Sequence, residues 1–128
     1  MTKFKTRILF LFVVSLFTMV SGCISEDNKG YPERLYIPVE GERLIIHGKE
    51  FFYGVTIRDS KSDEYGLGHE EDGHITATYK WLTVESSFDD DSVVITASPN
   101  DKNKKRKLTI EGDFGNAYAT IIVYQAAN

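Results

Sequence analysis

The sequence predicts an all-β fold over residues 31–128, an immunoglobulin-like β-sandwich of about seven strands. Apolar residues there recur at every second position, which is the period of a half-buried strand. Turn-forming segments such as Ser98–Asp101 and Gly112–Asp113 separate the apolar runs, at a spacing of roughly 8–12 residues. No window in this region shows the spacing of an amphipathic helix of ordinary length. A small β-barrel is the alternative architecture.

Seven segments have the character of strands. They are Arg34–Val39, Arg43–His47, Phe51–Ile57, Tyr79–Glu85, Ser92–Ala97, Arg106–Glu111 and Tyr118–Gln125. Pro38 lacks a backbone donor, which places the first segment at a sheet edge. The β-branched run Val93–Thr96 is typical of a buried strand. We expect Trp81, in the fourth segment, to fill the core of the sandwich.

The longest irregular stretch is Arg58–Gly73, which is rich in acidic residues, histidine and glycine. Loops of this length are uncommon in compact domains and are often functional or mobile. We therefore expect either a functional loop here or a mobile, solvated insertion.

The first residues have the pattern of an export signal. Basic Lys3, Lys5 and Arg7 precede an apolar run, Ile8–Phe17. The segment Val20–Cys23 follows and resembles the lipobox of bacterial lipoproteins. By this resemblance residues 1–22 are a lipoprotein signal peptide, and the Cys23 thiol is joined to a diacylglycerol.

Two alternatives to lipidation fit the same segment less well. A plain secretory signal needs an A-x-A-like cleavage site, which is absent here. A transmembrane helix needs about 20 apolar residues, and the stretch Ile8–Val20 is shorter than that. Each buried acyl CH₂ contributes about 0.8 kcal/mol, so two or three chains form a stable anchor. The expected location is the cell envelope, with the protein anchored to the outer membrane.

Residues 23–30 are expected to form a short flexible tether, because Ile24–Gly30 is polar and has no aromatic residue. Ser25-Glu26-Asp27 resembles the surface-export signals of Bacteroidetes lipoproteins. Two acidic residues also occur by chance in any solvated leader, so the periplasmic and the surface-exposed locations both stay open.

The charge of the chain argues against a nucleic-acid partner. Residues 1–22 hold three of the 15 basic residues and none of the 19 acidic ones, so their removal changes the net charge from −4 to −7. An acidic surface repels phosphate backbones. Because Cys23 is the single cysteine, the domain has no internal disulfide and depends on its hydrophobic core.

The C-terminal half carries five motifs in a characteristic order. They are Trp81–Val84, Val93–Ala97, Asn100, Arg106–Ile110 and Ile121–Gln125. This order resembles the BACON domain of Bacteroidetes over residues 79–126. The resemblance implies an immunoglobulin-like sandwich, a place in the cell envelope and binding of carbohydrate or mucin. It implies no catalytic residues.

Three tyrosines near loops are candidate ligand-binding residues, since aromatic faces stack on sugar rings. They are Tyr65, Tyr79 and Tyr118. Each is equally compatible with an ordinary half-exposed position in a strand or loop.

A second candidate is a Zn²⁺ or Ca²⁺ site formed by His69, Glu70, Asp72 and His74, which combine carboxylates with imidazoles. Their spacing is not that of the HExxH motif, in which the histidines are four residues apart. Asp89–Asp91 likewise lacks the alternating spacing of a calcium loop. Solvated acidic turns are the alternative interpretation for both segments.

Enzymatic activity has little support in the sequence, which contains no G-x-S-x-G or glycine-rich phosphate motif and implies no cofactor. The basic run Lys102–Lys107 is either a contact for an anionic partner or a solvated hairpin tip. We expect a non-enzymatic lipoprotein that binds glycan through its loops. The alternative is a protein-interaction module, such as a subunit of an outer-membrane complex or a protease inhibitor. A metal-dependent hydrolase is a third hypothesis.

Overall fold

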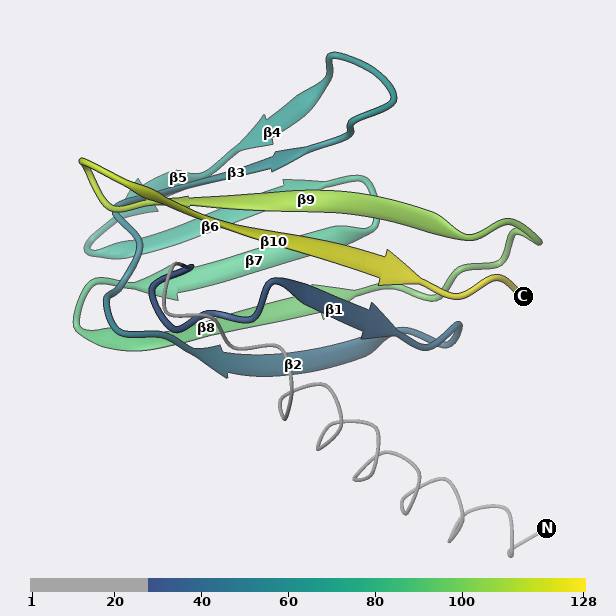
Figure 1. Ribbon diagram of the computed structural model, residues 1–128, viewed down its shortest axis with the longest axis horizontal. Helices are drawn as coiled ribbons and strands as arrows, with labels where there is room; N and C mark the ends of the chain where they lie inside the picture. The colour runs from purple at the N-terminus through teal and green to yellow at the C-terminus, as the bar shows by residue number, and fades with distance from the viewer. Residues whose placement is uncertain (1–27) are drawn as a thin grey trace, which may run out of the picture.

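The structure, a computed structural model, describes residues 28–128 as two five-stranded sheets packed face to face (Figure 1). The strands are β1 Arg34–Ile37, β2 Glu42–His47, β3 Gly54–Arg58, β4 Tyr65–Leu67, β5 His69–Glu71, β6 His74–Tyr79, β7 Leu82–Ser87, β8 Asp90–Ala97, β9 Arg106–Asp113 and β10 Tyr118–Gln125. Residues 28–128 contain no α-helix, and hence no helix that is long and apolar enough to cross a membrane.

Sheet 1 has the strand order β1-β10-β9-β3-β4, and sheet 2 has the order β2-β8-β7-β6-β5. All neighbouring strands are antiparallel except β1 and β10, which pair in parallel with Arg34 opposite Ile122. The β2-β8-β7 and β3-β9-β10 orders match strands B-E-D and C-F-G of the immunoglobulin fold. The predicted sandwich is therefore confirmed, and the barrel alternative is wrong.

The described residues form ten strands rather than seven, and the three additional ones lie between Arg58 and Tyr79. The expected irregular stretch contains β4 and β5, which belong to different sheets. Glycine at positions 66 and 68 lets the chain pass from sheet 1 to sheet 2, because neighbouring atoms approach these positions closely. A Cβ at Gly66 would lie 2.8 Å from the Thr78 carbonyl oxygen, and one at Gly68 would lie 2.7 Å from Ile75 Cγ2.

The predicted strand Tyr79–Glu85 is wrong, because a hairpin turn interrupts it. Lys80 has a φ of 55°, and β6 ends before it while β7 begins at Leu82. Trp81 therefore lies in the turn and is only partly buried against the core. Leu82, the next residue, is fully buried and takes the core position that we expected for the tryptophan.

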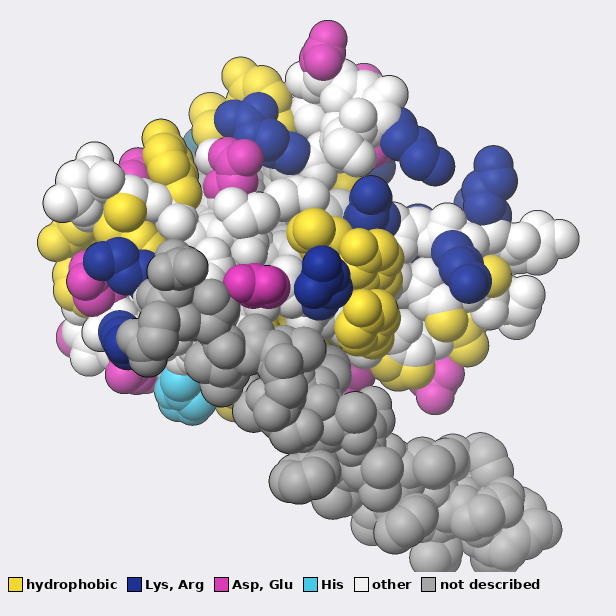
Figure 2. Space-filling model, in the orientation of Figure 1, with side chains coloured by type: hydrophobic (Ala, Val, Ile, Leu, Met, Phe, Trp, Pro, Cys, Tyr) yellow, Lys and Arg dark blue, Asp and Glu magenta, His cyan; other side chains and the backbone are white. Residues whose placement is uncertain are grey.

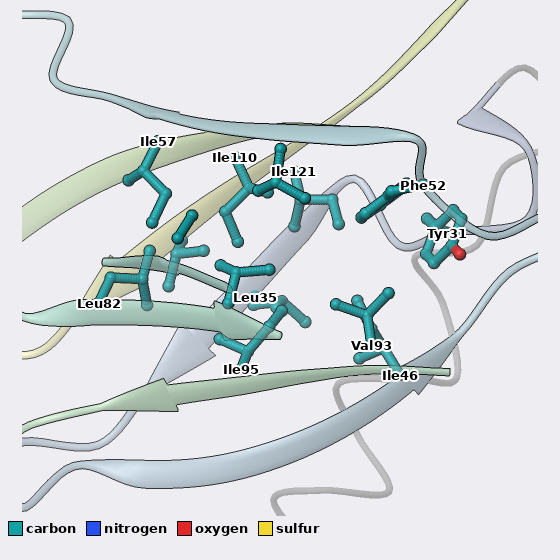
Figure 3. Close-up of a cluster of buried hydrophobic side chains, with 14 of the residues drawn as sticks. Tyr31, Leu35, Ile46, Phe52, Ile57, Leu82, Val93, Ile95, Ile110 and Ile121 are labelled. Atoms are coloured by element: carbon teal, nitrogen blue, oxygen red, sulfur yellow. The ribbon is translucent and has the colours of Figure 1, made fainter. Parts of the chain in front are cut away.

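The core lies between the two sheets, where alternate residues of each strand point inward (Figure 3). Sheet 1 contributes Leu35, Ile57, Ile110 and Ile121, and sheet 2 contributes Ile46, Leu82, Val93 and Ile95, all at most 7% exposed. Burial of one such side chain contributes roughly 1.5–3 kcal/mol. This period of two leaves the outer face of each sheet to polar and aromatic side chains.

Three aromatic rings close one end of the core. The centroid of Tyr31 lies 4.7 Å from that of Phe52 and 6.3 Å from that of Phe114. The Tyr31 hydroxyl donates a hydrogen bond to the Glu50 carbonyl oxygen, and burial raises its pKa. Phe52 lies flat against the backbone of β9 at Gly112, a position that leaves no room for a side chain.

The folded domain begins before Tyr31, because Asn28 is already part of it. The Asn28 side chain is 8% exposed and bonds to both backbone groups of Thr120 in β10, each at 2.9 Å. The predicted tether is therefore wrong for Asn28–Gly30. Its remaining residues, 23–27, and the signal peptide, 1–22, lie outside the described residues.

Replacing Gly112 with alanine is expected to destabilise the fold by about 1–3 kcal/mol. The new Cβ would lie 2.2 Å from Phe52 Cε1, and that ring is fully buried against Tyr31 and Phe114. Urea unfolding followed by circular dichroism measures the change. Gly54→Ala is the matched control, since a Cβ at position 54 would lie no closer than 3.5 Å to its nearest neighbour, the Asp113 Cβ. Equal stability of the two variants would contradict this account of the aromatic end.

Candidate functional site

The outer face of sheet 1 carries four of the seven tyrosines of the chain. Tyr36 from β1, Tyr118 and Tyr124 from β10, and Tyr65 from β4 all occupy outward positions of the alternating pattern. Tyr36, Tyr65 and Tyr118 are 55%, 50% and 65% exposed. We call this surface the tyrosine face. It also includes Arg34, Thr56, Arg58, Leu67, Lys107, Thr109, Glu111 and Thr120.

One side of the tyrosine face is a stacked pair of rings. Tyr36 and Tyr124 are opposite each other in the parallel β1–β10 pair, with centroids 5.2 Å apart and planes inclined by 10°. Lys107 is opposite Tyr124 on β9, and its Nζ lies 6.0 Å from the centroid of that ring. The row therefore combines two parallel aromatic rings with an adjacent cation.

Arg58 is the centre of the other side. Its Nε donates to Glu111 Oε1 at 3.0 Å, and its Cζ lies 5.2 Å from the Tyr65 ring centroid. The hydrogen bond and charge of Glu111 raise the pKa of Arg58, with smaller contributions from Tyr65 and Tyr118. The guanidinium thus stays charged and contacts both Glu111 and the exposed ring of Tyr65.

The two sides belong to one open surface, which faces the viewer in Figure 2. Hydrophobic side chains lie there in separate groups, some of them beside basic side chains. Neighbouring strands lie about 4.8 Å apart, so the face from β1 to β4 is roughly 19 Å wide. Threonine hydroxyls lie between the two groups of tyrosines. Such a surface presents aromatic rings for stacking and several groups for hydrogen bonding to an elongated ligand.

Two of the three predicted tyrosines, Tyr65 and Tyr118, lie on this face, and Tyr79 does not. Tyr79 is partly buried against the core, and its hydroxyl donates to Glu64 Oε1 at 2.8 Å. The next residue, Lys80, donates to Asp59 Oδ2 at 3.1 Å. The Lys61 N–H and then Lys80 lower the pKa of the Asp59 carboxyl. Tyr79 therefore holds the loop between β3 and β4 in place.

The four predicted metal ligands do not form one ligand set. His69 is opposite Thr76, and His74 is opposite Glu71, so both histidines point outward from sheet 2. Glu70 alternates to the other side and accepts a hydrogen bond from the Gly73 N–H at 2.8 Å. Within residues 28–128 no three histidine, cysteine or acidic side chains are grouped so as to hold a metal ion.

The acidic run Asp89–Asp91 has its own structural use in the β7–β8 turn. The Asp89 carboxylate accepts the Ser87 hydroxyl at 2.6 Å, which lowers the pKa of Asp89. Asp90 likewise accepts the backbone N–H and the hydroxyl of Ser92, at 3.0 and 2.9 Å. These carboxylates therefore stabilise the turn.

Three residues from the C-terminal motifs meet at the end of the sandwich opposite the aromatic one. Arg106 Nε donates to Gln125 Oε1 at 2.7 Å, and its Cζ lies 4.6 Å from the Trp81 ring centroid. Arg106 also donates to the carbonyl oxygens of Ser98 and Pro99, at 3.2 and 3.1 Å. Gln125 is 1% exposed and donates to the Ser98 carbonyl oxygen at 2.9 Å.

Asn100 completes this arrangement. Its side chain is 2% exposed and donates to the carbonyl oxygens of Lys104 and Ala126, at 3.0 and 2.9 Å. It therefore fixes the β8–β9 connection against the segment after β10. Trp81, Asn100, Arg106 and Gln125 are thus packed for structural reasons, whereas Lys107, Thr109 and Tyr124 of the same motifs point outward.

Comparison with known proteins supports the fold. No family model matches the chain, and no curated protein matches it. A solved structure, the NMR structure of a protein from Bacteroides thetaiotaomicron, superposes with a TM-score of 0.55 at 18% sequence identity. The match covers 75% of this chain and 77% of that one. At this identity the likeness establishes a shared fold.

Sequence reasoning missed Tyr36, Tyr124, Arg58 and Glu111 as members of a common surface. The alternation of each strand indicates which residues point outward, and Tyr36 and Tyr124 lie at such positions. The strand order that places them side by side depends on the β1–β10 pairing between distant segments. β4, which carries Tyr65, is only three residues long and gives little periodic signal.

Arg106→Ala is expected to destabilise the domain by about 2 kcal/mol, since it leaves the buried Gln125 amide and two carbonyl oxygens without their charged donor. Chemical denaturation monitored by Trp81 fluorescence measures the loss. Lys105→Ala, at the exposed neighbouring position, is the control and should change stability by less than about 0.5 kcal/mol. An Arg106 variant as stable as this control would refute the structural role of the cluster.

Proposed function

We propose that this chain is a non-enzymatic, lipid-anchored protein of the cell envelope whose tyrosine face binds carbohydrate. The observation that carries the proposal is the grouping of four outward tyrosines with Arg58, Glu111 and threonine hydroxyls on one open sheet. Sugar rings have apolar C–H faces that stack on aromatic rings, and hydroxyls at their edges that need donors and acceptors. The tyrosine face offers both kinds of group.

The proposed binding surface differs from the loops that we expected from the sequence. Tyr65 and Tyr118 remain ligand contacts in this proposal, and Tyr36 and Tyr124 join them. Tyr79 is left out, because its hydroxyl and ring are used by Glu64 and Lys80. An open face about 19 Å wide suits a chain of several sugar residues better than a single monosaccharide.

The sequence of the first residues supports an envelope location. The lipobox-like segment ends at Cys23, which lies outside the described residues. The structural neighbour comes from a Bacteroides species, in agreement with the resemblance of the C-terminal motifs to a Bacteroidetes domain. Lipidation at Cys23, outer-membrane anchoring and BACON-like carbohydrate binding are parts of the same proposal.

The second candidate function is recognition of a partner protein by the same face. Leu67 is 58% exposed beside Tyr65, and tyrosine and arginine are enriched in protein interfaces. In this case the chain is a subunit of an outer-membrane complex or an inhibitor.

Alanine variants at Tyr36, Tyr65 and Tyr118 are expected to weaken glycan binding by about 2- to 10-fold each. This range corresponds to the roughly 0.5–1.5 kcal/mol of a stacked aromatic contact. Affinity electrophoresis through gels that contain mucin or plant polysaccharides measures the retardation. Ile45→Ala, an exposed apolar residue on the outer face of sheet 2, is the control and should bind like the wild type.

Absence of retardation for a folded wild-type protein in every gel would overturn the carbohydrate proposal. Stoichiometric capture of one envelope protein, lost in the three tyrosine variants and kept in Ile45→Ala, would then establish the second candidate.

Lipidation predicts that cells grown with radiolabelled palmitate incorporate label into the full chain. Cys23→Ser should remove the label completely, because Cys23 is the single cysteine. Gel autoradiography of the precipitated protein measures this. Retained label in the serine variant, or an unlabelled wild type, would contradict the proposed anchor.

A further inference from the structure

A second group of aromatic side chains lies at one end of the sandwich, apart from the tyrosine face. Phe51 and Tyr53 come from the β2–β3 connection, and Phe88 comes from the β7–β8 turn. The Phe51 ring centroid lies 5.0 Å from that of Tyr53 and 5.3 Å from that of Phe88. Phe51 and Phe88 are partly exposed and Tyr53 is 55% exposed. We call these three rings the aromatic tip.

The tip differs from the buried rings beneath it. Phe52, between Phe51 and Tyr53, points inward and packs with Tyr31 and Phe114 in the core. Phe51 and Tyr53 point the other way, so the core does not account for their position. Phe88 packs against the edge of the core, and the exposed ring of Tyr53 adds apolar surface at this end.

The chain enters the domain at this same end. The Lys49 N–H donates to the Lys29 carbonyl oxygen at 2.8 Å, and Lys29 Nζ lies 3.6 Å from Glu50 Oε2. Lys29 is thus adjacent to the segment that carries Phe51. Figure 1 shows the β2–β3, β7–β8 and β9–β10 connections at this end, and the C-terminus at the other.

The distance to the proposed anchor is short. Five peptide steps separate Cys23 from Asn28 in the sequence. Even at full extension they span at most roughly 18 Å. A lipid on Cys23 therefore keeps the domain close to the bilayer surface, and the end nearest the lipid is the one that bears the aromatic tip.

We propose that the aromatic tip inserts into the headgroup region of the membrane that holds the anchor. This inference rests on the lipidation of Cys23 proposed above. Aromatic side chains concentrate at this depth of a bilayer, where a ring is partly apolar and partly wet. Tyrosine is suited to it because its hydroxyl stays hydrated while its ring is buried.

The charges around the tip identify the kind of lipid surface. Two basic residues, Lys29 and Lys49, lie near the tip. The acidic residues near it are Glu50 and Asp89–Asp91, and the Gly48 N–H holds Asp91 beside this segment by donating to its carbonyl oxygen. Acidic groups in this number oppose anionic lipids. The surface that fits is zwitterionic, and contact with it depends on the rings rather than on charge.

Insertion of the tip sets the orientation of the tyrosine face. The strands run between the two ends of the sandwich, so an inserted end directs them away from the membrane (Figure 1). The outer face of sheet 1 then stands upright and open to the side. A ligand reaches it without passing between the protein and the bilayer.

The experiment uses the full lipidated chain in phosphatidylcholine vesicles with or without bromine on the acyl chains, because bromine quenches tryptophan only at short range. Tyr53→Trp places a reporter in the tip. Native Trp81, in the β6–β7 turn beside Arg106, reports the other end. Tyr36→Trp is the matched control on the tyrosine face and has the same exposure as Tyr53.

Brominated lipid is expected to lower the added emission of Tyr53→Trp at least twofold, and to leave the emissions of Trp81 and of Tyr36→Trp unchanged. Flotation of the vesicles shows whether the lipid holds the protein. If the Tyr53→Trp protein floats with the vesicles but shows no quenching, tip insertion is overturned and the anchor stands. Equal quenching of the Tyr53→Trp and Tyr36→Trp reporters has the same consequence. A protein that does not float refutes the anchor, and the tip proposal falls with it.

Discussion

The packing of the two inner sheet faces against each other stabilises the whole fold, because a chain with a single cysteine has no internal disulfide to support it. Every inward residue from Leu35 to Val123 contributes to that contact, and the rings of Tyr31, Phe52 and Phe114 seal one end of it. Polar groups seal the other end through Gln125. Because the interior holds the sheets together alone, the outer faces are free to vary. The tyrosine face is such a surface.

Local signals predicted those parts of the fold that depend on one strand at a time. The alternation in Arg106–Glu111 and Tyr118–Gln125 gave strands close to β9 and β10, because long amphipathic segments keep a clear period. The periodicity did not predict β4 and β5, since each has only three residues, most of them polar or glycine. Glycine at positions 66 and 68 leaves room for close neighbours from β3 and β6, which is a tertiary effect.

The candidate site was predictable in part for a related reason. Tyr65 and Tyr118 are exposed, but the arginine that contacts Tyr65 lies in a different strand. Trp81 illustrates the opposite error. Its aliphatic neighbours suggested a central strand, whereas the positive φ of Lys80 makes a turn, and the indole packs on the Arg106 guanidinium. Side-chain partners across strands are not visible in local periodicity.

The parallel pairing of β1 with β10 has a consequence for the order of events in folding. Arg34 and Ile122 are 88 positions apart, and Asn28 reaches 92 positions along the chain to bond Thr120. As long as β10 has not emerged, β1 and Asn28 have no partner to pair with. Closure of the sandwich therefore waits for nearly the whole domain to emerge, and such long-range topologies acquire their native structure slowly. Until then the inner faces of the strands already formed stay exposed to solvent.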